Sequence, residues 1–234
     1  MLNPKKKLAK KEIKKDPLLS SYEKATGFYY SNKKNLTRMV LALLAFIAGI
    51  FWYADNRRQN NDHAMSELGK VFSIYDQASS NPSQYAVAIN GQTEKGIVGL
   101  KAIVNKYGGS HGGEIARCYL ANCYRMTGKF DEAISEYKSF SPPTTLLKAS
   151  AQAGLGACYE AKKQYADAAS AYDKAANVAS NPLVTPDYMV AAARCYGLSG
   201  EKEKAVAMFK RIKVEYPNTA AARDADRYIG QFSV

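Results

Sequence analysis

The hydrophobic positions of this 234-residue chain follow three different spacings. Residues 39–54 form an unbroken run of 16 residues without a charged or strongly polar side chain. Between residues 59 and 79 the spacing changes to every third or fourth position, and one stripe contains Met65, Leu68, Phe72 and Tyr75. After residue 111, one pattern of small and aromatic residues recurs three times. Such runs and stripes are typical of helices, so the sequence predicts an all-α protein.

The apolar run predicts a single membrane-spanning helix over residues 36–54. Its 16 uninterrupted residues would span roughly 24 Å as a helix, against a hydrocarbon core of about 30 Å. Arg38 can extend toward the headgroups, and Phe51 to Tyr53 are typical of an aromatic belt at the opposite interface. A buried core helix and a cleaved signal peptide are the alternatives. No polar face and no small-x-small cleavage pattern accompanies the run, which favours an uncleaved anchor.

The charge of the chain is concentrated beside this run. Residues 1–58 contain 13 Lys and Arg against 4 Asp and Glu, whereas residues 59–234 contain 20 against 17. A basic segment next to an apolar one favours a membrane surface over nucleic acid as the partner. The positive-inside rule then places the N-terminus in the cytoplasm. In a Gram-negative bacterium the rest of the chain would then lie in the periplasm, and the expected location is the inner membrane.

The segments around the anchor predict further helices. Residues 1–35 form a basic cytoplasmic tail, in which Asp16-Pro17 interrupts any helix and Leu18–Tyr30 could form a short amphipathic piece. Residues 55–110 form a helical linker with a degenerate first repeat. Within that linker we expect helices over Gln59–Ser79 and Glu94–Tyr107, separated by the breakers Pro82 and Asn90-Gly91.

Residues 111–218 contain three copies of one pattern. "LANCYRMTGKFDEAISEY" (120–137) aligns with "LGACYEAKKQYADAASAY" (155–172) at an offset of 35 residues. The third copy, "AARCYGLSGEKEKAVAMF" (192–209), follows at an offset of 37 residues. A period of this length with two helices per unit is typical of helical-hairpin solenoids. Residues 219–234 echo the segment before the first copy and predict a C-terminal capping helix.

The copies resemble tetratricopeptide repeats. The signature positions are held in the first copy by Leu120, Ala121, Tyr124, Gly128, Phe130, Ala133 and Tyr137. The second copy carries Leu155, Gly156, Tyr159, Tyr165, Ala168 and Tyr172, and the third Ala193, Tyr196, Gly200, Ala205, Phe209 and Pro217. Lys163 replaces the inter-helix glycine of the second copy, Lys202 replaces an aromatic residue of the third, and the signature tryptophan is absent. The small residues among them, such as Ala121, Gly156 and Ala193, let two helices approach closely.

Each of the four cysteines precedes a tyrosine, and the repeat explains three of them. Cys123, Cys158 and Cys195 occupy the same position in successive copies, where the family usually has a small residue. A buried cysteine behaves as a small hydrophobe, so we expect all three, and Cys118, to serve packing. An inter-repeat disulfide and a metal or redox site are the alternatives, although no CxxC spacing occurs.

No catalytic constellation is present in the sequence. His63 and His111 lie far apart, and no nucleophile elbow, metalloprotease motif or phosphate-binding glycine loop occurs. We therefore expect a protein that is not an enzyme and needs neither cofactor nor metal.

The resemblance to tetratricopeptide repeats implies a binding groove along the first helix of each unit. Projected onto this chain, the groove positions are Asn122, Arg125 and Met126 in the first copy, Ala157, Glu160 and Ala161 in the second, and Asp187, Val190, Arg194 and Leu198 in the third. A groove of mixed polarity suits a peptide or a partner helix, while an ordinary solvated face is the alternative.

The layout of the whole chain resembles the YfgM-like ancillary subunits of the bacterial SecYEG translocon. That resemblance implies a membrane-anchored interaction module that assists protein translocation or envelope protein folding. Its implied partners are translocon or other membrane-complex subunits, a periplasmic chaperone and membrane lipids, with no nucleic acid or small-molecule substrate. The alternative is a structural or assembly subunit of another membrane complex.

Overall fold

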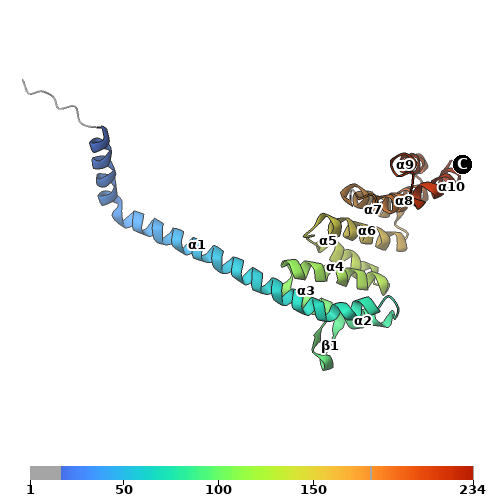
Figure 1. Cartoon of the computed structure of the whole chain (residues 1–234), viewed down its shortest axis with the longest axis horizontal. Helices are drawn as coiled ribbons and strands as arrows, with labels where there is room; N and C mark the ends of the chain where they lie inside the picture. Colours follow the sequence, from blue (N-terminus) through green and yellow to red (C-terminus); the bar gives the residue numbers. More distant parts are fainter. Residues whose placement is uncertain (1–16, 180, 234) are drawn as a thin grey trace, which may run out of the picture. The chain divides into compact units, whose positions relative to one another are not determined.

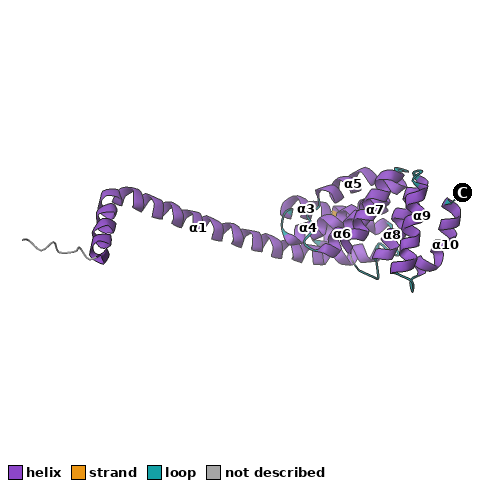
Figure 2. Cartoon of the chain, turned by 90° about the horizontal axis from the view of Figure 1, so that it is seen from above, coloured by secondary structure: helices purple, strands orange, loops and turns teal. Residues whose placement is uncertain are grey.

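The structure is a computed structural model that describes residues 17–179 and 181–233. Almost all of its regular structure is helical (Figure 2), and the predicted all-α fold is confirmed. The chain forms two compact units, Met1–Asp55 and Asn56–Val234. Of the predicted basic tail, residues 1–16 lie outside the described residues.

Helix α1 extends without interruption from Pro17 to Gln77. Proline suits this first position because its missing N–H has no intrahelical partner there. The sequence predicted a separate helix starting at Gln59, and that boundary is wrong. Residues 55–62 are polar but contain neither glycine nor proline, so nothing in them interrupts the backbone ladder. A change from apolar to polar side chains does not end a helix by itself.

The segment after α1 differs from the prediction. Helix α2, Ser83–Asn90, occupies a stretch that was expected to break the pattern, and it buries Tyr85, Ala88 and Ile89. A short hairpin follows, in which each strand has two residues. Strand β1 is Gly91–Gln92, the 3-10 turn η1 is Thr93–Lys95 and strand β2 is Ile97–Val98. Helix α3 begins only at Leu100 and ends at Tyr107.

Glycines cause the difference in this segment. Gly91 and Gly96 have φ angles of 85° and 64°, which other residues adopt only at a cost. Gly99 lies so close to the backbone of Asn90 and Gly91 that a Cβ atom would overlap it. The predicted helix over residues 94–107 is therefore wrong before Leu100, because Gly96 and Gly99 close a hairpin instead.

The remaining helices form pairs. The bounds are α4 His111–Met126, α5 Phe130–Ser139, α6 Thr145–Ala161, α7 Tyr165–Ala179, α8 Thr185–Leu198, α9 Lys202–Glu215 and α10 Ala220–Phe232. Consecutive helices of this series pack against one another, and Figure 1 shows the pairs following one another from green to red. Ser110, Thr144 and Thr219 cap α4, α6 and α10 through their side-chain oxygens.

Small residues lie where these helices cross. Ala121, Ala133, Ala168, Ala193 and Ala205 have no exposed surface, as their signature positions predict. At Gly156 an added Cβ would lie 2.9 Å from Cγ of Tyr172, so only glycine lets that ring reach the helix backbone. Small residues therefore let the paired helices approach closely, and large side chains such as Tyr172 pack against them.

All four cysteines are buried as free thiols. Cys123, Cys158 and Cys195 have no exposed surface, which confirms their predicted burial at equivalent sites. Burial raises the pKa of Cys118 and Cys158 to about 11 and that of Cys123 and Cys195 to about 12. Because the thiolate is the reactive form, such thiols are poor nucleophiles at neutral pH.

Candidate interaction surface of the repeat unit

The predicted groove residues lie on α4, α6 and α8, the first helices of the three pairs. Met126, Ala161 and Leu198 are the last residues of these helices, and all three are exposed. They therefore form an apolar row at equivalent positions of successive repeats. One residue earlier on each helix come Arg125, Glu160 and Gly197.

The first repeat places a polar cluster beside this row. The Tyr137 hydroxyl of α5 donates a 2.7 Å hydrogen bond to Oδ1 of Asn122 on α4. Burial raises the pKa of this tyrosine, and the nearby Arg125 guanidinium acts in the opposite direction. The buried Nε of Arg125 has no hydrogen-bond partner among the described residues. Asn122 is thus already engaged, and the Arg125 guanidinium lies beside the same tyrosine.

The second and third repeats share an ion pair. Nη2 of Arg194 on α8 lies 2.6 Å from Oε1 of Glu160 on α6, and the Tyr172 hydroxyl donates to the other carboxylate oxygen at 3.1 Å. Glu160 and Arg194, which the groove pattern of the family predicts as two separate contact residues, are therefore bonded to each other. The buried Nε of Arg194 is also without a partner among the residues that the structure describes.

The other predicted residues of the third repeat have different surroundings. Asp187 is exposed in the first turn of α8. Val190 is partly buried and packs against the hydrophobic cluster of the C-terminal repeats. It contributes to packing as much as to surface, so the exposed part of the groove on α8 consists mainly of Asp187, Arg194 and Leu198.

Aromatic side chains from α1 and α4 extend this surface beyond the predicted residues. Tyr119 lies two helical turns before Met126, on the same face of α4. Its ring contacts those of Phe72 and Tyr75, with centroids 5.5 and 4.7 Å apart. Met65 and Phe72 are 43% and 42% exposed. The stripe through Met65 and Phe72 predicted a helix, and only the position of the neighbouring helices shows that the stripe is half open.

Two tyrosines on the second helices were also missed. Tyr137 and Tyr172 stand at signature positions of the repeat, and their hydroxyls donate hydrogen bonds to Asn122 and Glu160. Gly154 gives the Tyr137 ring its place, because a Cβ there would overlap the ring. The signal was available, since tyrosine rather than phenylalanine stands at both positions, and a buried hydroxyl needs a partner.

Three shallow hollows of the repeat unit lie outside these rows. One of about 370 Å³ is lined by Arg57, His111, Glu114 and Pro142, among others. A second of about 500 Å³ adjoins Lys202, Val206 and Phe232, and a third of about 240 Å³ adjoins Phe140 and Lys148. In the described residues, no group of three His, Cys, Asp or Glu side chains is placed to hold a metal.

The N-terminal unit contributes the apolar part of α1. One described helix is long and apolar enough to cross a membrane, with a mean hydropathy of 1.9 in its most apolar window and none of that window buried. Leu41, Leu44, Phe46 and Phe51 are among its exposed side chains. By length and composition, the segment fits a membrane span or a signal sequence.

Comparison with known families identifies one of the repeats. Residues 187–219 match the family model of the tetratricopeptide repeat, a stretch that covers α8 and α9. No curated protein matches the chain. The match agrees with the helical pairs and with the resemblance of the three sequence copies.

Proposed function

We propose that this chain, which contains a tetratricopeptide repeat, is a membrane-anchored module that binds another protein. Repeats of this type mediate protein–protein interactions, and their stacked first helices form extended binding surfaces. The observation that carries the proposal is the exposed apolar row Met126, Ala161 and Leu198 beside the guanidinium groups of Arg125 and Arg194.

The chemistry of this surface suits a partner segment with both apolar and acidic groups. Met126 adapts its shape to different apolar contacts. The two guanidinium groups favour a carboxylate or a backbone carbonyl as acceptor. Alanines in the middle repeat, Ala157 and Ala161, leave room for protruding partner side chains. A peptide or a partner helix meets these requirements.

The anchoring half of the proposal rests on residues 36–54. The run is exposed along the helix, and an exposed apolar surface of this length requires lipid or protein around it. The excess of Lys and Arg before the run supports a cytoplasmic N-terminus, which places the repeats in the periplasm of a bacterial inner membrane. A reporter that is active only outside the cytoplasm, fused after Val234, is expected to be active. Activity of a cytoplasm-only reporter at that site would overturn this orientation.

The finer role that we propose is assistance to protein translocation or envelope protein folding. The layout of tail, apolar run and repeats supports it through the resemblance to translocon-associated subunits. Tethering raises the effective concentration of a binding surface toward membrane-bound partners, so a weak groove suffices. The near balance of charge in residues 59–234 fits such weak and broad binding.

Copurification from mild detergent, with partners identified by mass, tests the binding half. In the full chain, Arg125→Glu with Leu198→Ser should reduce capture of the partner roughly tenfold or more, because both changes lie in the candidate surface. Val214→Ser with Arg223→Glu is the matched control. It makes the same chemical changes at exposed positions of α9 and α10 and should leave capture intact.

A second candidate is a structural subunit of another membrane complex. The half-open Met65 and Phe72 of α1 favour it, because they give α1 apolar surface in addition to the predicted groove residues. If the groove variant is silent while substitutions in residues 39–54 abolish the complex, the structural role replaces the adaptor role.

A further inference from the structure

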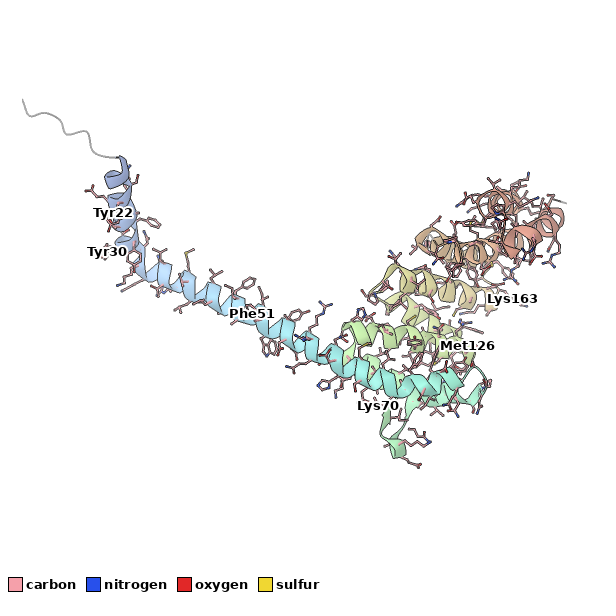
Figure 3. The ribbon with its side chains drawn as sticks, viewed as in Figure 1. Tyr22, Tyr30, Phe51, Lys70, Met126 and Lys163 are labelled. Carbon is pink, nitrogen blue, oxygen red and sulfur yellow. The ribbon has the colours of Figure 1, made fainter. Side chains whose placement is uncertain are left out.

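Within the N-terminal unit, helix α1 bends between a short first segment and the apolar segment. Tyr22 and Tyr30 lie before the bend and Phe51 lies after it (Figure 3). The Oγ of Ser31 and Nδ2 of Asn32 both donate hydrogen bonds to the Phe28 carbonyl, at 3.0 and 3.1 Å. Side chains that bond to a preceding carbonyl compete with the helix ladder and bend helices. The bend therefore has a local cause.

The bend carries a polar hollow. Its volume is about 440 Å³, and its lining consists of Tyr30, Ser31, Asn32, Lys33, Lys34 and Asn35. Two lysines, two asparagines and two hydroxyl-bearing residues thus border this hollow. The Ser31 hydroxyl and the Asn32 amide are already engaged, because Nδ2 of Asn32 also donates to Oγ of Ser31. The two lysine ammonium groups and the amide of Asn35 are the donors that suit an anion with several acceptor oxygens.

The helical segment before this hollow has an exposed face of tyrosines. Tyr22 and Tyr29 are seven residues apart and Tyr30 is adjacent, so the three hydroxyl-bearing rings share one side of the first segment. They are 69%, 49% and 74% exposed. Tyrosine combines an apolar ring with a polar tip, and such rings collect at the headgroup level of membranes.

The charges of the segment have one sign. Between residues 17 and 54, the sequence contains Lys24, Lys33, Lys34 and Arg38 but only one carboxylate, Glu23. Lys34 precedes the apolar run at Met39 by five residues, or about 7.5 Å of helix. That distance places both lysines of the hollow at the depth of lipid phosphates if the run enters a bilayer.

We propose that the bend of α1, through Lys33, Lys34 and the amide of Asn35, binds the headgroup of an anionic phospholipid. The tyrosine face lies along the membrane surface beside it. This inference rests on the proposed membrane anchor, because only an inserted run brings the hollow to the headgroups. It goes beyond that anchor by assigning a lipid class and the residues that select it. The positive charge and the adjoining apolar run favour a lipid over a soluble anion.

The test uses the full chain in mild non-ionic detergent, titrated with phosphatidylglycerol or phosphatidylcholine, with bound lipid counted by native mass spectrometry. Phosphatidylglycerol should be retained in preference to phosphatidylcholine. Lys33→Gln with Lys34→Gln should weaken phosphatidylglycerol binding about fivefold per lysine, on the order of 20-fold together. The matched control, Lys95→Gln with Lys101→Gln, removes the same charge from exposed positions of the repeat unit and should have no effect.

Three outcomes overturn the inference. Equal loss in the control variant would indicate a general charge effect. Equal retention of both lipids would remove the selectivity. Displacement of phosphatidylglycerol by inorganic phosphate at similar concentration would indicate a soluble-anion site. The anchor is tested separately by alkaline carbonate extraction of membranes. Extraction of the wild-type chain would contradict the anchor, whereas a membrane-retained chain without lipid selectivity would contradict the headgroup site alone.

Discussion

Arg194 in the third repeat is ion-paired with Glu160 in the second, with 2.6 Å between Nη2 and Oε1. The two residues are 34 positions apart in sequence and stand on helices α8 and α6. Because the Tyr172 hydroxyl also donates to Glu160, the carboxylate joins α6, α7 and α8. The pair therefore belongs both to the candidate surface and to the contact between repeats.

This ion pair predicts that reversing the charge of Arg194 destabilises the chain more than removing it. Arg194→Gln should lower the free energy of unfolding by about 0.5–1 kcal/mol, since partly exposed pairs contribute modestly. Arg194→Glu should cost more, because it places two carboxylates together. Chemical denaturation measures both effects.

The charge-swapped variant provides the control for this prediction. Glu160→Arg combined with Arg194→Glu should recover part of the stability lost by Arg194→Glu alone. If the double variant is no more stable than the sum of the single changes predicts, the pair does not couple the repeats. For the same reason, Arg194→Glu is a poor probe of partner binding.

Lys163 provides a second prediction. It stands between α6 and α7 with a φ angle of 59°, where the equivalent residues Gly128 and Gly200 have φ angles of 75° and 96°. A left-handed conformation is unfavourable for lysine and easy for glycine. Lys163→Gly should therefore raise the free energy of unfolding by about 0.5–1 kcal/mol, measured by denaturant titration.

Lys129→Gly is the matched control for Lys163. Lys129 is exposed beside α5 with a φ angle of −84°, so glycine there only adds freedom to the unfolded chain. The control should be neutral or slightly destabilising. Equal effects of the two substitutions would show that backbone strain at Lys163 is not the cause.

The close contact between Gly197 and Phe232 gives a third prediction. A Cβ at Gly197 on α8 would overlap the Phe232 ring of α10. Gly197→Ala should therefore destabilise the chain by about 1–3 kcal/mol through overpacking. The thermal unfolding midpoint measures this loss.

Gly230→Ala separates this overlap from helix propensity. Gly230 also lies in α10, but a Cβ there would meet no atom within 4 Å. This substitution should stabilise the chain by about 0.5–1 kcal/mol. Combining Gly197→Ala with Phe232→Leu should restore part of the loss. A neutral Gly197→Ala would contradict the docking of α10 through this contact.

The buried thiols predict a loss of stability at alkaline pH. Burial raises the pKa of Cys123 and Cys195 from 9.0 to about 12. The folded chain therefore binds more protons than the unfolded chain above about pH 9, and stability must fall as pH rises from there toward 12. Denaturation midpoints between pH 8 and pH 11 measure the slope.

Replacing Cys123, Cys158 and Cys195 together by alanine should reduce this slope. Each replacement should cost only about 1 kcal/mol at neutral pH, because alanine fits a small buried site with a minor cavity. A mass change on reduction of the wild-type chain would reveal a disulfide and contradict the packing role. An unchanged alkaline slope in the triple variant would assign it to tyrosines such as Tyr75, whose pKa burial raises to about 12.

Local patterns gave the helices their approximate places in the repeat region. The spacing of Ala121, Gly128 and Ala133 predicts two helices meeting at a small-residue crossing, and α4 and α5 follow it. The segment before α3 was predicted wrongly, because the apolar pattern of residues 94–107 favoured a helix in spite of Gly96 and Gly99. Whether such glycines interrupt a helix depends on what approaches them, here the backbone of Asn90 and Gly91.

The sequence by itself determined the helical class, the period of the repeats and the apolar run, because each is a pattern that can be read along the chain. Only the tertiary structure decided that Arg194 faces Glu160, that Tyr119 meets Phe72, and that Met65 remains half open. These relationships depend on the offset between helices that are distant in sequence. That offset is set by many small contacts at once, such as the tyrosine ring over Gly156, and no single stretch of residues encodes it.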